Sequence, residues 1–240
     1  VWVWMGDAAL ADESMIVDMP WLASPQWATV GGQFNIPTNY VAMHENLLDQ
    51  THFAVLHSDT VGTPAYARSD LEVEAKGDQI RILRELRDSE PPPIYAVPMK
   101  LEGRRVNRYS DSRFATPALH VAHARIENPE PRKGELSNYH VNIVHAFTPE
   151  HQGTIHYWWF NSRDFALQDA GSSDYLRQSS MRAYQEDVDA LTWIQQNYDL
   201  EYQQSGQAPM EMSFRPDRPG ILMRQLLQKH SNVERNAPVL

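Results

Sequence analysis

Cysteine is absent from this 240-residue chain, so neither a disulfide nor a cysteine-ligated cluster can form within it. No apolar run approaches the ~18 residues that a membrane-spanning helix needs, so no membrane partner is expected. Basic residues are outnumbered, since 21 Lys and Arg face 31 Asp and Glu, and this balance argues against a nucleic-acid partner. An acidic composition without a secretory-signal pattern is typical of a cytoplasmic enzyme.

The start of the chain predicts that upstream sequence is missing. Residues Val1–Asp7 alternate large apolar side chains like a strand inside a fold, and no initiator Met precedes them. Prolines and the Gly31-Gly32 pair then predict loop and connector. We therefore expect residues 1–35 to be a strand and connector after an absent domain, and residues 36–240 to form the main domain.

Hydrophobic periodicity predicts helices on either side of a set of strands. The expected helices are Tyr40–Leu56, Asp174–Asn197 and a short Leu222–Gln228. The expected strands are a hairpin over Ala67–Arg87 turning at Gly77-Asp78, then Phe114–Ile126, Asn138–Thr148 and Thr154–Arg163. Because short turns join successive strands, the sequence predicts an α+β fold with an antiparallel β-sheet flanked by helices.

One short segment carries metal-binding chemistry. It places Asn46, Asp49, His52 and His57 among apolar residues, and two His with one carboxylate is the ligand set of non-haem Fe(II) oxygenases. On an ideal helix the first three share a face, whereas His57 lies about 140° around from His52. Because two ligands of one ion must converge, we predict that the helix is distorted or ends between His52 and His57.

The best candidate for the third ligand lies in the second long helix. Asp187 is three residues from Tyr184 and four from Leu191, on the side that the pattern predicts to be buried. A buried acid is costly unless it is paired or bound to metal. Glu186 and Asp189 are predicted to be solvated.

The string Glu45–His52, followed by His57 and Gly62, resembles the signature of the catalytic domain of Rieske non-haem iron oxygenases, in the vanillate/dicamba O-demethylase group. Residues 1–7, 156–165 and 186–187 resemble other segments of that family. The resemblance implies a helix-grip-like fold for residues 36–240, which would be the mononuclear iron catalytic domain.

The resemblance also implies roles for the residues of the motif. His52, His57 and Asp187 would bind Fe(II), and Asn46 would be a nearby polar group. Asp49 would hydrogen-bond His52 and couple it to the cluster of a neighbouring subunit in a homotrimer. Rieske [2Fe–2S] clusters need two Cys and two His, so the cluster is expected on the absent N-terminal domain.

The segment from His140 to Pro149 resembles the family stretch that lines the substrate site. Strand alternation puts His140 and Asn142 on one face with Val144, and Ile143 and His145 on the other. We expect His140, Asn142 and, as an aromatic wall, Trp158 to contact substrate.

These observations predict an O2-dependent monooxygenase that acts on a small aromatic substrate, by O-demethylation of an aryl methyl ether or aromatic acid. Electrons would come from a reductase or ferredoxin. Three alternatives stay open: a ring-hydroxylating dioxygenase, a zinc hydrolase with two His and one Asp, and a metal-free module that binds an apolar ligand.

Overall fold

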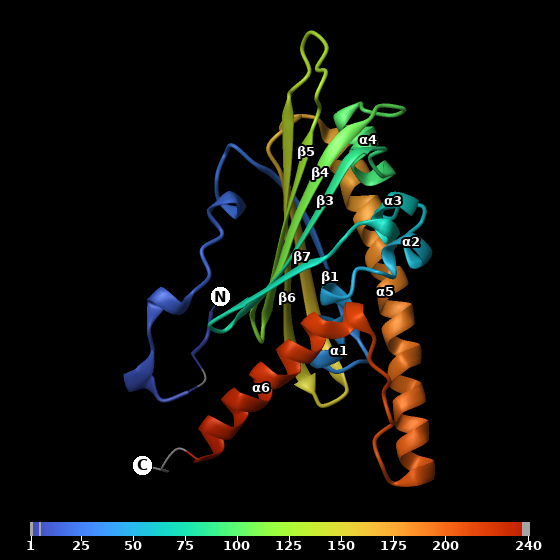
Figure 1. The fold of residues 1–240 in the computed structure, drawn as a ribbon. Coiled ribbons are helices and arrows are strands. Elements are labelled where there is room, and N and C mark those ends of the chain that lie inside the picture. The colour runs from blue at the N-terminus through green and yellow to red at the C-terminus, as the bar shows by residue number, and fades with distance from the viewer. Residues whose placement is uncertain (1, 5, 237–240) are drawn as a thin grey trace.

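The computed structural model of the chain describes residues 2–4 and 6–236. Within these residues, seven strands form one sheet in the order β1-β7-β6-β5-β4-β3-β2, and each neighbouring pair is antiparallel (Figure 1). The strands are β1 (Ala28–Ile36), β2 (Glu72–Lys76), β3 (Gln79–Ser89), β4 (Val106–Thr116), β5 (Leu119–Glu127), β6 (Asn138–His151) and β7 (Thr154–Arg163). The predicted α+β fold with an antiparallel sheet is confirmed.

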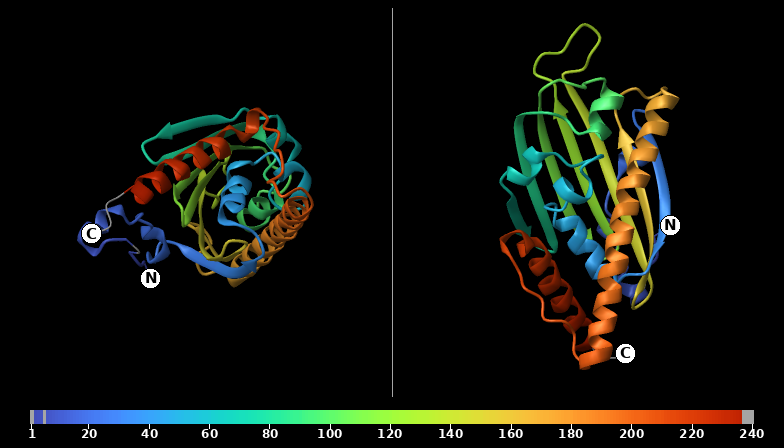
Figure 2. Two further views of the ribbon diagram at one scale, coloured as in Figure 1. Left: turned by 90° about the horizontal axis from the view of Figure 1, so that it is seen from below. Right: turned by 90° about the vertical axis from the view of Figure 1, so that its right-hand side faces the viewer.

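The helices gather on one face of this sheet, which we call the inner face (Figures 1 and 2). They are α1 (Tyr40–Leu48), α2 (Phe53–Leu56), α3 (Pro64–Arg68), α4 (Pro93–Met99), α5 (Ala170–Ser205) and α6 (Arg218–Asn236). Seen from below in Figure 2, the curved sheet wraps around α1. No helix in the described ranges combines the length and apolarity that crossing a bilayer requires.

The main core lies between α5 and the inner face. Leu176, Val188 and Leu191 of α5 belong to one buried cluster with Tyr157 and Trp159 of β7. The opposite, outer face is covered in part by the N-terminal segment, whose side chains from Val17 to Leu22 pack over strands β5 and β6. The sheet therefore separates two different environments.

Strand β1 corrects the expectation of a connector before residue 36. The Gly31-Gly32 pair indicates a loop by composition, yet both residues lie in β1, where Gly32 pairs with Trp159. A Cβ on Gly32 would lie 2.8 Å from the Trp159 ring. The glycines thus allow the edge strand to lie flat against a large buried indole, a packing role that a single sequence does not reveal.

Other boundaries also differ from the predictions. Residues 2–4 form no strand, and residues 1 and 5 lie outside the described ranges. The predicted strand Phe114–Ile126 is a hairpin of β4 and β5 that turns at residues 117–118. Helix α4 was not predicted, because the prolines at its start were interpreted as a break, although proline at the first position favours a helix.

Helices α5 and α6 extend beyond their predicted ends. Element boundaries are the least reliable part of such predictions, because a polar helix end carries little hydrophobic periodicity. The hairpin around Gly77 is confirmed, and Gly77 has a φ of 58°, as its two-residue turn requires.

Candidate metal centre

The helix that carries the motif is interrupted, but one turn earlier than the sequence predicted. Helix α1 ends at Leu48, and Asp49 is extended, with φ −97° and ψ 99°. The Asp49 Oδ1 atom accepts hydrogen bonds from Thr51 N at 2.9 Å and Thr51 Oγ1 at 2.7 Å. This side-chain turn competes with the helix and ends it, so the break lies before His52 instead of between His52 and His57.

The short helix α2 then spans the two imidazoles. His52 is its N-cap and His57 its C-cap, and the His57 amide donates to Phe53 O at 3.2 Å. The His57 carbonyl accepts from the amide of Gly62 at 2.9 Å. A Cβ on Gly62 would overlap the Phe53 carbonyl oxygen. Glycine at this position is therefore required for the close approach that fixes His57.

Helix α5 supplies the carboxylate from its buried face, as predicted. Asp187 is 6% exposed and lies one turn from the buried Ala183 and Leu191. Asp189, on the other side of the helix, is exposed and accepts a hydrogen bond from Gln185. Glu186 was expected to be solvated, but its carboxylate accepts a hydrogen bond from His57 Nδ1 at 2.7 Å.

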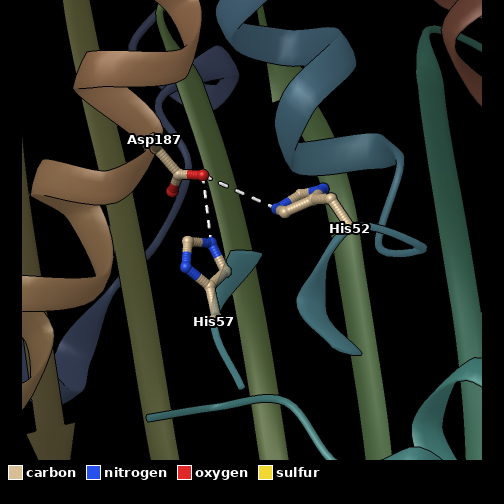
Figure 3. A group of neighbouring side chains, drawn as sticks. All are labelled: His52, His57 and Asp187. Atoms are coloured by element: carbon tan, nitrogen blue, oxygen red, sulfur yellow. Dashed lines mark hydrogen bonds and ion pairs between the residues drawn. The ribbon is translucent and has the colours of Figure 1, made fainter. Parts of the chain in front are cut away.

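The three side chains converge from two distant parts of the chain (Figure 3). His57 Nε2 lies 3.0 Å from Asp187 Oδ1, and His52 Nε2 lies 3.6 Å from the same oxygen. One ligand atom can be chosen from each residue so that the three atoms all lie within 4.8 Å of one another. Two imidazoles and one carboxylate are thus placed around a single point.

The electrostatics of the cluster favour a cation. Burial lowers the pKa of His52, although the Asp187 carboxylate opposes this. Burial also acts to lower the pKa of His57, but its hydrogen bonds to Asp187 and Glu186 outweigh burial and the pKa is raised. His52 Nε2 is buried without a hydrogen-bond partner among the described residues. An unpaired imidazole nitrogen facing a carboxylate fits a transition metal ion such as Fe(II).

Asn46, Asp49 and His52 line one open depression of about 670 Å³ between α1, α5 and α6. They share it even though the helix that was expected to align them ends at Leu48. The predicted hydrogen bond from His52 to the Asp49 carboxylate is not formed in the described structure, where that carboxylate accepts hydrogen bonds from Thr51 instead.

The three predicted substrate contacts lie away from this centre, on the outer face. His140 Nδ1 donates to Asp164 Oδ2 at 2.6 Å, and Asn142 Oδ1 pairs with His123 at 2.6 Å. Trp158 is 37% exposed and donates to Gln33 on the neighbouring strand. The structure does not bring these side chains together with His52, His57 and Asp187, because strand alternation turns them toward the other side of the sheet.

A small cavity of about 110 Å³ adjoins the metal centre on the inner face. Beside His57 and Asp187, its lining includes residues that were not selected from the sequence: Tyr95, Arg108, His120, Ile143, His145 and Tyr184. Alternation had already placed Ile143 and His145 on one face, but it does not tell which face meets the helices. Burial lowers the pKa of His145 to about 4 and that of His120 well below its usual value, so both imidazoles are neutral.

A curved antiparallel sheet that encloses two imidazoles and a carboxylate beside a cavity defines an α+β protein with a candidate non-haem metal centre. The family model described as the vanillate O-demethylase oxygenase C-terminal domain matches residues 36–232, and the chain belongs to this family.

Individual relatives agree with this assignment. The chain is 28% identical to a vanillate O-demethylase oxygenase subunit of a Pseudomonas strain, over 99% of this chain and 73% of that protein. It is 32% identical to a toluene-4-sulfonate monooxygenase system iron-sulfur subunit of Comamonas testosteroni, over 78% of this chain and 56% of that protein. The chain therefore spans only part of the relatives that it matches.

A crystal structure of dicamba monooxygenase bound to 3,6-dichlorosalicylic acid has the same fold. Its TM-score is 0.85 at 24% sequence identity, and the match covers 97% of this chain and 67% of that one. The additional length of these proteins lies outside the region compared.

Proposed function

We propose that this chain is the catalytic part of the oxygenase component of a Rieske-type non-haem iron monooxygenase that removes a methyl group oxidatively from an aromatic substrate. The observation that carries the proposal is the convergence of His52, His57 and Asp187 on one point beside a cavity. In an aryl methyl ether, hydroxylation of the methyl group gives a hemiacetal, which collapses to a phenol and formaldehyde.

The three residues would bind one side of a mononuclear Fe(II) ion and leave its other coordination positions open. Bound in this way, Fe(II) supplies the redox chemistry toward O2 at its open positions, while the protein sets geometry and excludes water. The hydrogen bond from His57 Nδ1 to Glu186 would orient that imidazole and raise its basicity as a ligand. Glu186 is thus a positioning residue that the sequence alone did not identify.

The cavity supports an aromatic substrate. Its volume of about 110 Å³ is comparable to the engineered cavity of about 150 Å³ that binds benzene, so a single ring fits after small side-chain movements. Two relatives carry the names of vanillate and toluene-4-sulfonate, both of which are aromatic anions.

The partners in this proposal come from the family. A [2Fe–2S] Rieske cluster on a separate N-terminal domain would pass electrons from a reductase or ferredoxin, and Asp49, in the depression beside His52, would lie on the route. The residues before β1 would connect that domain to the catalytic domain, whose sheet includes β1. A homotrimer in the cytoplasm is the expected assembly.

Metal analysis of three variants tests the ligand set. His52→Ala and Asp187→Asn are expected to lose bound iron and substrate-dependent O2 consumption, because each removes one of three ligands. Asp189→Asn, two residues further along α5 and exposed, serves as the matched control and keeps both. Stoichiometric iron in the His52→Ala protein would contradict the ligand assignment.

Metal content, ligand binding after chelation and product analysis separate the alternatives. Zinc at full occupancy with activity independent of O2 would favour a hydrolase. Unchanged affinity for an aromatic ligand after complete chelation, together with no O2 consumption in the metal-loaded protein, would favour a binding module. Product analysis distinguishes a demethylase, which releases formaldehyde, from a ring-hydroxylating dioxygenase.

A further inference from the structure

Three arginines are buried within the described residues, namely Arg84, Arg108 and Arg163. Two of them have several acceptors. Arg163 Nη2 donates to the carbonyls of Ala166 at 2.9 Å and Asp169 at 3.2 Å, among other contacts. These contacts give Arg163 a structural role in fixing the connection from β7 to α5.

Arg84 is held in a similar way. Its Nη1 donates to the carbonyls of Tyr66 at 2.7 Å and Ser69 at 3.2 Å, and to Ser69 Oγ at 2.8 Å. Its guanidinium carbon lies 4.4 Å from the centre of the Tyr66 ring. Arg84 therefore stabilises the end of α3, and these contacts account for its burial without a ligand.

Arg108 is different. It is 5% exposed, and its guanidinium donates one hydrogen bond, from Nη1 to Thr63 Oγ1 at 3.2 Å. No carboxylate in the described part of the chain forms an ion pair with it. Among the groups close enough to act on its charge, Arg84 is a second cation, and Tyr66 and Tyr95 are neutral because burial raises their pKa. Its guanidinium carbon lies 5.5 Å from the centre of the same Tyr66 ring, so two cations share one aromatic side chain.

A buried cation without an anion is unfavourable, because water has been removed and nothing replaces it. Burial accordingly lowers the pKa of Arg108, and the nearby Arg84 lowers it further. Arg84 and Arg163 also lack a carboxylate, but several carbonyl and hydroxyl oxygens accept their hydrogen bonds. Arg108 has a single such acceptor and lines a cavity, which makes it a candidate for binding a ligand.

The location of Arg108 indicates which ligand. It lines the same cavity as His57 and Asp187, and the apolar side chains of Ala122 and Ile143 line the space as well. An aromatic ring in this cavity can therefore place an acidic substituent on Arg108 while the rest of the ring lies next to the metal centre. The guanidinium fork matches a carboxylate in a bidentate arrangement.

We propose that Arg108 is the specificity-determining residue of the substrate cavity, and that it binds the carboxylate of an aromatic acid and so selects anionic over uncharged substrates. The proposal rests on the proposed function of the cavity. It goes beyond it by assigning the anion site to a residue outside the metal-binding motif.

Calorimetric binding to the iron-loaded full chain tests the proposal. The probes are vanillate, benzoate and toluene-4-sulfonate, each with its uncharged primary amide or sulfonamide. In the wild-type protein, vanillate or benzoate is expected to bind more tightly than its amide. Arg108→Gln should weaken binding of the carboxylate by at least about tenfold and change binding of the amide less than about twofold.

Arg108→Lys should recover part of the affinity, because a point charge replaces the fork. A preference for the sulfonate over both carboxylates would overturn the assignment to a carboxylate. Equal binding of the acid by wild type and Arg108→Gln, or no binding of any aromatic anion to the wild type, would overturn the proposal. Iron content measured on the same samples tests the proposed function separately, since Arg108 is not a metal ligand.

Thermal unfolding of the ligand-free protein gives a second readout. Arg108→Met is expected to leave Tm unchanged or to raise it, because it removes an uncompensated buried charge. Arg84→Met should lower Tm, because it removes three hydrogen bonds that fix the end of α3. If Arg108→Met lowers Tm as much as Arg84→Met does, Arg108 is a structural residue and the proposal fails.

Discussion

The two faces of the sheet use the same residue types in different ways. On the outer face, His140 and His123 are partly exposed, and their partners are the neighbouring Asp164 and Asn142. On the inner face, His44, His120 and His145 are buried, and burial lowers the pKa of all three. The difference teaches that residue type alone does not identify a site, because the face on which a side chain lies decides its chemistry.

The largest effect is expected from Gly62, which fixes His57 on the inner face. Gly62→Ala forces a Cβ onto the Phe53 carbonyl, so α2 must move, at a cost of about 2 kcal/mol or more in unfolding free energy. Iron binding should fall with it. Denaturant unfolding and metal analysis measure the two effects.

Gly153 is the matched control, since a Cβ there meets nothing within 4 Å. Gly153→Ala, in the turn between β6 and β7, should change stability by less than about 0.5 kcal/mol. Equal stability and iron content in Gly62→Ala and Gly153→Ala would show that α2 is not held by the contact described.

An intermediate effect is expected from His44, whose pKa burial lowers to about 3. Below the ordinary pKa of about 6.5, the unfolded chain binds a proton at His44 that the folded chain does not. The contribution of His44 to the free energy of unfolding is therefore complete above that pH and is lost as the pH falls toward 3. At pH 5 this linkage amounts to about 2 kcal/mol.

His44→Gln should therefore flatten the loss of stability between pH 7 and pH 5 in the metal-free protein, as followed by denaturant unfolding. The difference between variant and wild type at pH 8 gives the cost of repacking, because His44 is neutral in both states there. An unchanged slope between pH 7 and pH 5 would mean that His44 is already protonated in the folded protein.

The smallest effect is expected on the outer face. His140 is paired with Asp164 and lies across the sheet from the cavity, so His140→Ala should change KM for the aromatic substrate less than about twofold. A tenfold rise in KM with unchanged folding would show that His140 contacts the substrate, and would contradict the assignment of the substrate site to the inner face.

The two His ligands could be predicted because they lie in one short motif, and the distant Asp187 because of its place on the predicted buried face of a helix and the family resemblance. His52, His57 and Asp187 were selected as a ligand set, and the structure brings them together. The position of the helix break could not be predicted, since it depends on a side-chain turn between Asp49 and Thr51 that competes with the helix.

The cavity could not be predicted, because strand alternation divides the side chains between two faces but does not tell which face lies toward the helices. The inward face of β6 is defined by α5, whose contacts are distant in sequence, as the ring pair of His145 and Tyr184 shows. Arg108 was missed for a related reason. Its missing counter-ion is visible only once its burial and its neighbours are known.

X-ray absorption at the iron edge tests the central claim most directly. For protein reconstituted with Fe(II), we predict scattering from two imidazoles and a carboxylate oxygen in the wild type, and one imidazole fewer in any residual iron of His57→Ala. Identical ligand spectra in the two proteins, or an iron coordinated without imidazole, would contradict the assignment of His52, His57 and Asp187 as one metal site.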